Sequence, residues 1–272
     1  MTKEEKSQLA PVLYIPHGGG PLPLFAHAGH EALVRFLRAI PAELGTPEAI
    51  LLISAHWEAT VPTVTGGAQP NLLFDYYNFP TEAYQIEYPA PGHPQLAGKI
   101  QQLLGDSGVT AEIDTRRGFD HGLFVPLKLM YPEATIPCVQ LSLMQGLDPA
   151  AHIRIGKALA GLRTENILTI GSGFSFHNMK AFSFSDSPVP DEKNDRFDRW
   201  LQDICTHPTH APEAREAKLV AWDQAEHARY CHPREEHLLP LHVCCGMAGT
   251  PARVVFNDFI LGKRATAFLW SY

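Results

Sequence analysis

The sequence lacks the features that mark membrane-spanning and secreted proteins. No apolar run in its 272 residues approaches the ~20 residues that a helix needs to cross a bilayer. The opening stretch, MTKEEKSQLAP, contains no apolar segment of the kind found in a secretory signal. We therefore expect a cytoplasmic protein that is not inserted into a membrane.

Basic residues are also scarce. The formal net charge is −7 and the sequence pI is about 6.0. A protein that binds the phosphate backbone of a nucleic acid needs clustered lysine and arginine, so we exclude nucleic acid as a partner. Apolar residues make up 45% of the chain and charged residues 19%, which is typical of an ordinary globular protein.

Cysteine is present in an arrangement that excludes a disulfide framework. The chain has five cysteines, an odd number, and the two closest are adjacent, at positions 244 and 245. The sequence contains no CxxC pair of the kind that structural zinc sites use. We expect free thiols in a reducing compartment.

What the chain does contain is an alternation of apolar runs and helix-period stretches. The apolar runs, bounded by Pro, Gly or Asn, predict buried strands at residues 12–15, 49–55, 138–143, 166–173, 253–256 and 266–270. Apolar residues at helical spacing predict helices at residues 30–40, 93–106 and 148–163. This alternation favours an α/β fold with a mostly parallel sheet that is covered by helices on both faces.

The segment from residue 181 to 235 differs from the rest, because it predicts helices joined by polar, proline-containing loops. We interpret it as a helical insertion or lid. No stretch is rich enough in Gly, Ser or Pro to act as a linker between domains, and there is no internal repeat. We therefore predict a single α/β domain over residues 1–272.

Histidine is abundant, with 14 copies. His17, His56 and His177 each follow a predicted strand and have small neighbours. Ligands bind at the carboxyl ends of the strands in an open parallel sheet, so these three imidazoles could converge on one point. His121 and His237 lie where helices are predicted to begin, and His121 directly follows an aspartate that could cap its helix.

Most of the other histidines lack that setting. Those on predicted helices or in polar loops are interpreted as structural or surface residues: His27, His30, His93, His152, His207, His210, His227 and His232. His242 lies five residues after His237, a spacing that does not place two side chains on one helix face, and its own role stays open between core and site. Neutral imidazole suits zinc, copper, iron and nickel. A histidine cluster without cysteines predicts a catalytic metal site with an open position.

Five short motifs, in order along the chain, resemble those of a known enzyme family. They are HGGGP at 17–21, SAHWE at 54–58, DHGLFVPL at 120–127, GSGFSFHN at 171–178 and EEHLLPL at 235–241. In these motifs the chain is similar to the class III extradiol ring-cleavage dioxygenases, the LigB-like group, and within it to the 4,5-DOPA dioxygenase type. The resemblance implies a LigB-like fold, a three-layer αβα sandwich, with one mononuclear non-haem metal site.

The resemblance also implies a role for each matching histidine. His17, His56 and His237 correspond to metal ligands. His177 corresponds to a histidine beside the metal, counted as a fourth ligand when zinc is bound and as the acid/base residue in ring cleavage. His121 corresponds to a histidine that hydrogen-bonds substrate or oxygen. Relatives of the protocatechuate type have a glutamate where this chain has His237; with the all-histidine set we expect Zn²⁺ as the bound form and Fe²⁺ as the active form.

Ring cleavage gives these residue types a chemical purpose. A metal lowers the pKa of a coordinated hydroxyl, and a nearby histidine can accept and return a proton near neutral pH. The glycines at 18–20 would leave room beside the metal. The aromatic residues that could form a wall for the ring are Trp57, Tyr76, Tyr77, Phe79, Phe174 and Phe176. The expected partners are a substituted, DOPA-like catechol and O₂, and the protein is expected to be a monomer or homodimer.

Two other functions stay open at this point. An all-histidine site also suits a zinc-dependent hydrolase, in which Glu58 or Glu236 could act as the base and no O₂ would be needed. A non-catalytic metal-binding or interaction module could keep the same fold. Retention of every matching histidine favours an enzyme over such a module.

Overall fold

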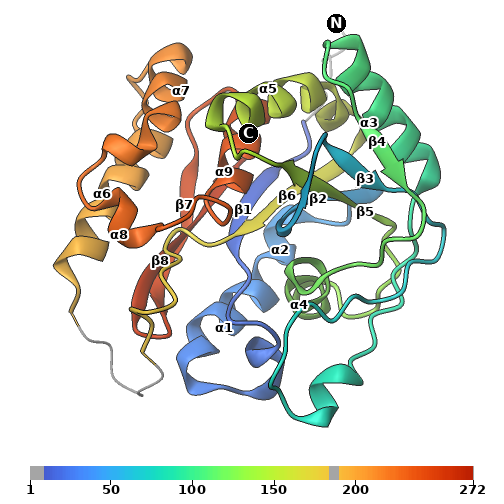
Figure 1. Cartoon of the computed structure of the whole chain (residues 1–272), viewed down its shortest axis with the longest axis horizontal. Coiled ribbons are helices and arrows are strands. Elements are labelled where there is room, and N and C mark those ends of the chain that lie inside the picture. Colours follow the sequence, from blue (N-terminus) through green and yellow to red (C-terminus); the bar gives the residue numbers. More distant parts are fainter. Residues whose placement is uncertain (1–8, 184–189, 272) are drawn as a thin grey trace, which may run out of the picture.

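Eight strands form one mixed sheet in the computed structural model, which describes residues 9–183 and 190–271. The strand order is β4-β3-β5-β2-β6-β1-β8-β7 (Figure 1). The strands are β1 (Val12–Pro16), β2 (Ala49–Ala59), β3 (Thr63–Thr65), β4 (Glu112–Asp114), β5 (Cys138–Met144), β6 (Ile167–Gly173), β7 (Arg253–Ile260) and β8 (Lys263–Trp270). The central strands β5, β2, β6 and β1 are parallel, whereas β8 is antiparallel to β1 and forms a hairpin with β7.

The central strands are buried on both faces, as their apolar sequences predict. Every residue of β1 and β6 is buried. Continuous apolar runs of this kind are typical of parallel strands that helices cover on both sides. All six predicted strands are present, and β3 and β4 were missed. With three residues each, β3 and β4 are too short to show a period of two.

Helices cover the two faces of the sheet in separate layers. The α-helices are α1 (Glu31–Ala39), α2 (Pro41–Leu44), α3 (Pro94–Asp106), α4 (His121–Met130), α5 (Pro149–Leu159), α6 (Glu192–Thr206), α7 (Pro212–Val220), α8 (Ala228–Cys231) and α9 (Leu239–Ala248). α9 lies against β6 and β1 with α5 beside it, and α4 packs on β2 and β6 with α1 beside it (Figure 1). In β6, Gly171 packs under α9 while its neighbour Ser172 contacts α4, so the two helices lie on opposite faces. The predicted α/β sandwich is confirmed.

Three helices begin directly after a residue whose side chain caps them, and for α4 the sequence predicts this cap at Asp120. The side chains of His93, Asp120 and Asp148 each accept a hydrogen bond from a backbone N–H in the first turn of α3, α4 and α5. α5 ends at Leu159, and residues 160–165 continue as a 3₁₀-helix. The Asp120 cap makes His121 the first residue of α4, at the edge of the sheet.

The predicted insertion at residues 181–235 contains α6, α7 and α8. α6 packs on β8 and β7, and α7 packs on α5 and α9 (Figure 1). Residues 184–189 of this segment lie outside the described residues. The lid role and the single-domain organisation stay predictions. Among the described residues, no helix is both long enough and apolar enough to cross a membrane.

Several histidines that were interpreted as structural are buried in the fold. His152 in α5 donates from Nδ1 to the carbonyl oxygen of Asp148 at 2.7 Å, and its Nε2 accepts from the backbone N–H of Met144 at 3.1 Å. Burial lowers the pKa of His152 to about 4, so the folded protein holds it neutral. His242 is also fully buried, with Nε2 at 2.9 Å from the carbonyl oxygen of Leu219, and is therefore a core residue.

The neutral state of His152 predicts a specific loss of stability in acid. An unfolded histidine gains its proton near pH 6.5, whereas folded His152 gains it only near pH 4. Stability from this residue is thus present above pH 6.5 and lost as the pH falls toward 4, with a slope of about 1.4 kcal/mol per pH unit. The free energy of unfolding is measured with urea at several pH values. Between pH 4 and 6.5, His152→Gln should reduce its dependence on pH by the amount that corresponds to one bound proton. An unchanged slope, equal to that of the exposed-site control His207→Gln, would contradict the assignment.

Candidate metal centre

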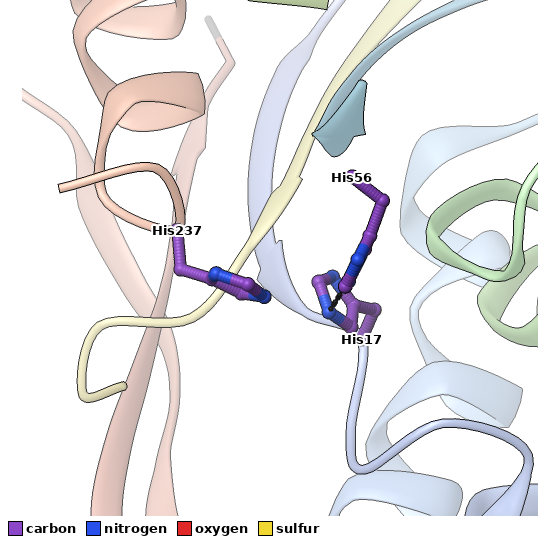
Figure 2. Close-up of side chains that lie close together, drawn as sticks. All are labelled: His17, His56 and His237. Atoms are coloured by element: carbon purple, nitrogen blue, oxygen red, sulfur yellow. Dashed lines mark hydrogen bonds between the residues drawn. The ribbon is translucent and has the colours of Figure 1, made fainter. Parts of the chain in front are cut away.

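Three histidines from distant parts of the chain meet at one point. His17 directly follows β1, His56 lies in β2, and His237 lies two residues before α9. One ring nitrogen from each lies within 4.8 Å of the others, and the Nε2 atoms of His17 and His56 are 2.9 Å apart. Figure 2 shows the ring of His237 pointing toward this pair. The structure therefore brings together the three residues that the resemblance assigns as ligands.

The apolar run at 49–55 predicted that His56 follows the end of its strand. His56 instead lies inside β2. β2 continues to Ala59, and its pairing with β5 shifts register between Ile53 and Glu58. Irregularities of this kind redirect side chains and are frequent next to active sites. Hydrophobicity alone does not show where a strand pair loses its register, so the predicted strand ended too early.

The ring of His17 is oriented by a serine that the sequence analysis did not consider. Ser172 in β6 donates its hydroxyl hydrogen to the carbonyl oxygen of Gly122 at 2.5 Å. Its oxygen lies 3.1 Å from Nδ1 of His17, so it accepts the Nδ1–H of that ring. This hydrogen bond leaves Nε2 of His17 with a free lone pair that faces His56. A serine between two glycines in a strand carries no sequence signal for this role.

The backbone around His237 is held by both neighbouring strands. Its carbonyl oxygen accepts hydrogen bonds from the hydroxyl of Tyr14 in β1 and from the backbone N–H of Phe174, both at 2.9 Å. Gly173 allows this approach, because a Cβ on Gly173 would clash with that same carbonyl oxygen. The Gly-Ser-Gly end of β6 therefore positions His237 as well as His17.

Asp75 holds two of the histidines and is a site residue that the sequence analysis missed. Its Oδ1 accepts hydrogen bonds from Nδ1 of His121 at 2.7 Å and from the backbone N–H of His121 at 3.0 Å. Its Oδ2 lies 3.6 Å from Nδ1 of His56. Burial alone would raise the pKa of Asp75, but the hydrogen bonds from His121 lower it to about 2. Asp75 is therefore ionised and fixes the proton of His121 on Nδ1.

His177 lies beside this group and stacks on His237. The two ring centroids are 3.4 Å apart and nearly parallel, and Oε1 of Glu236 lies 3.1 Å from Nδ1 of His177 and 3.0 Å from Nδ1 of His237. Burial raises the pKa of Glu236, yet the hydrogen bond with His177 and the charge of Arg234 bring it below its usual range. The ionised carboxylate of Glu236 thus contacts Nδ1 of both imidazoles.

The three clustered imidazoles are neutral. Burial is the main cause that lowers the pKa of His17, His56 and His237, and repulsion among the neighbouring histidines lowers each further. Neutral imidazole is the form that binds metal ions. The cluster can accept a divalent cation without first releasing protons at neutral pH.

A cavity of about 350 Å³ opens beside these rings. The five site histidines line it together with Asp75. Of the aromatic residues expected to form its wall, Tyr76, Tyr77, Phe79 and Phe174 line the cavity, whereas Trp57 and Phe176 do not. An aromatic ring that enters would therefore meet both aromatic side chains and imidazoles.

Backbone conformation and close packing require glycine in the turn after His17, apart from any need to leave room for a ligand. Gly18 has a φ of +89°, and a Cβ there would lie 2.5 Å from Cγ of Pro23. The N–H of Gly19 donates to Nε2 of His30 at 3.0 Å. The turn is therefore packed tightly against the following segment, which fixes the direction in which the chain leaves His17.

Comparison with known proteins agrees with this geometry. A family model described as the catalytic LigB subunit of aromatic ring-opening dioxygenase matches residues 11–262. The chain belongs to the LigB family. It is 38% identical to dioxygenase tasH of Hapsidospora irregularis, over 96% of this chain and 86% of that protein. It is also 40% identical to a 4,5-DOPA dioxygenase extradiol of Portulaca grandiflora, over 76% of this chain and 75% of that protein.

A solved structure shares the fold of this LigB-family chain. A crystal structure of an uncharacterized protein from Escherichia coli K12 matches it with a TM-score of 0.79 and 28% identity, covering 96% of this chain and 99% of the other. The predicted family, the predicted fold class and the predicted enzyme class, an extradiol ring-cleavage dioxygenase, are confirmed. None of these relatives supports the zinc-hydrolase alternative.

Because β6 approaches His237 closely at Gly173, we predict that metal affinity depends on a glycine at this position. We expect Gly173→Ala to weaken zinc binding at least tenfold, because the added Cβ must displace the backbone that carries His237. Competition with a chromogenic chelator measures this affinity. Gly161→Ala is the matched control, since a Cβ at Gly161 meets open space and should leave zinc binding unchanged. Equal affinities in the two variants would show that His237 does not need this backbone position.

Proposed function

We propose that this LigB-family protein is a metal-dependent extradiol dioxygenase that opens the ring of a substituted catechol with O₂. The observation that carries the proposal is the meeting of His17, His56 and His237 on the wall of a cavity that is also lined by aromatic rings. The dioxygenase names of the two curated relatives support the reaction. The name of the Portulaca relative supports a catechol ring that carries a side chain, as DOPA does.

We assign His17, His56 and His237 as the ligands of one divalent metal ion. The tautomers support the fit. His17 donates its Nδ1–H to Ser172, so its Nε2 carries a lone pair, which lies 2.9 Å from Nε2 of His56 in a hydrogen bond between the two rings. A divalent cation could take the place of the proton between these two nitrogens. The imidazole donor set suits both zinc and iron.

Zn²⁺ is proposed as the bound form and Fe²⁺ as the active form. When bound, the metal would lower the pKa of a catechol hydroxyl, and Fe²⁺ could also exchange electrons with O₂, which Zn²⁺ cannot. The protein's own part is to hold the ring against the aromatic wall and to keep the ligands neutral.

His177 is assigned as the acid/base residue. Its Nδ1 is held by Glu236 at 3.1 Å, which leaves Nε2 to exchange a proton with a hydroxyl in the cavity. The ionised Glu236 stabilises the imidazolium that forms when His177 accepts that proton. His121, with its own proton fixed on Nδ1 by Asp75, presents Nε2 as a hydrogen-bond acceptor that orients the reacting oxygen.

Oxygen consumption tests the proposed reaction directly. Protein reconstituted with Fe²⁺ without air should consume O₂ and a substituted catechol in equimolar amounts and form a yellow ring-opened product. The zinc-loaded protein should consume none. An oxygen electrode and absorbance spectra measure both. Absence of oxygen uptake across a broad panel of substituted catechols would overturn the proposal.

A single substitution separates the acid/base role from ligation. His177→Gln should lower kcat by about 10²-fold or more, because the proton acceptor is lost, while the metal content stays that of the wild type. Metal analysis and oxygen uptake on the same sample measure the two effects. His207→Gln, at an exposed position, should change neither. Loss of metal together with activity in His177→Gln would instead assign His177 as a ligand.

A further inference from the structure

Six apolar or aromatic side chains line the cavity beside the site histidines. We call them the collar: Leu22, Tyr77, Phe79, Met179, Phe182 and Leu261. Tyr77 and Met179 are 79% and 65% exposed, whereas His17 and His237 are 1% and 4% exposed. The cavity therefore has a buried floor of imidazoles and an open, apolar entrance.

The collar is built from separate segments that are held in place by other contacts. Leu261 lies in the turn between β7 and β8; its backbone N–H donates to Gly29 at 3.0 Å, and its carbonyl oxygen accepts from the N–H of Ser183 at 2.8 Å. The ring of Phe182 packs edge to face on that of Phe174, with centroids 5.5 Å apart. The apolar surface at the entrance is thus a positioned feature of the fold.

The charges around the cavity oppose an anionic substituent. The lining includes the acidic side chain of Asp75, and among the described residues that line the cavity there is no lysine or arginine. Arg117 and Arg234 near the site are paired, with Asp120 at 3.1 Å and with Glu58 at 2.6 Å. A carboxylate at the entrance would lose hydration without gaining a cation as partner.

We propose that the collar is a subsite for an uncharged apolar side chain, alkyl or aryl, on the catechol ring, and that it discriminates against carboxylate-bearing catechols. The inference rests on the proposed ring cleavage and narrows its substrate class to catechols whose side chain, unlike that of DOPA, carries no carboxylate. A catechol whose hydroxyls reach the buried imidazoles has its substituent toward the open end, where the collar lies. Each methylene that leaves water against this surface should raise kcat/KM about three- to fourfold.

A matched substrate series tests the subsite. The iron-loaded enzyme is assayed with 4-methylcatechol, 4-ethylcatechol, 4-propylcatechol and 3-(3,4-dihydroxyphenyl)propionate, the last of which adds a carboxylate to an ethyl-length chain. We expect kcat/KM to rise along the alkyl series and to be at least tenfold lower for the acid than for 4-propylcatechol. Equal or better turnover of the acid would overturn the proposal.

Charge added to the collar should reverse the preference. Met179→Lys places a cation at an exposed collar position and should raise the acid-to-propyl ratio of kcat/KM at least tenfold. Val220→Lys adds the same charge at an exposed apolar residue outside the cavity and should leave the ratio unchanged. Lys180 follows Met179 and is exposed; if the wild type prefers the acid and Lys180→Gln removes that preference, a lysine outside the collar is the selector and the proposal fails.

Measuring catechol binding without turnover tests the subsite independently of the proposed reaction. Calorimetric titration of the zinc-loaded wild type with 4-propylcatechol and with the acid reports selectivity without turnover. If no catechol is opened but 4-propylcatechol binds at least tenfold tighter, the reaction is wrong and the apolar subsite stands. If the acid binds as tightly or tighter, the subsite is wrong whatever the reaction.

Discussion

The rest of this structure depends on holding three neutral imidazoles, two of them buried and one partly buried, within reach of one cation. The ring nitrogens that a metal would bind lie close together, and burial lowers the pKa of each of these histidines so that it stays neutral. Each ring has a polar partner on its outer side: Ser172 for His17, Asp75 for His56 and Glu236 for His237. Such partners fix both the tautomer and the direction of a ligand. The central strands and the start of α9 provide the rigid backbone from which these partners act.

The sequence predicted the parts of this arrangement that have a local signal. The apolar runs placed the central strands, and the histidine motifs placed His17 and His237 at positions that the fold brings together. Asp75 was missed because its partner His121 is 46 residues away and the intervening chain shows no regular pattern. The end of β2 was misplaced because a register shift depends on the partner strand. Roles that arise from pairing across the fold are therefore the ones that a single sequence hides.

The two ends of the cavity arise from different kinds of structure. The floor is built on β1, β2 and the residues just before α9, which the core holds. The entrance is built from turns and loops, including the β7–β8 turn with Leu261. Loops vary among relatives more readily than the elements that they connect. Membership of the LigB family therefore indicates the reaction more firmly than it indicates the group carried by the ring.

The hydrogen bond from Tyr14 to the carbonyl of His237 joins residues 223 positions apart. During synthesis on a ribosome, Tyr14 emerges first, and His237 is added 223 residues later. A nascent chain that stops before residue 237 carries only two of the three clustered imidazoles. In the proposed site, all three imidazoles can therefore hold a cation only after residue 237 has left the ribosome.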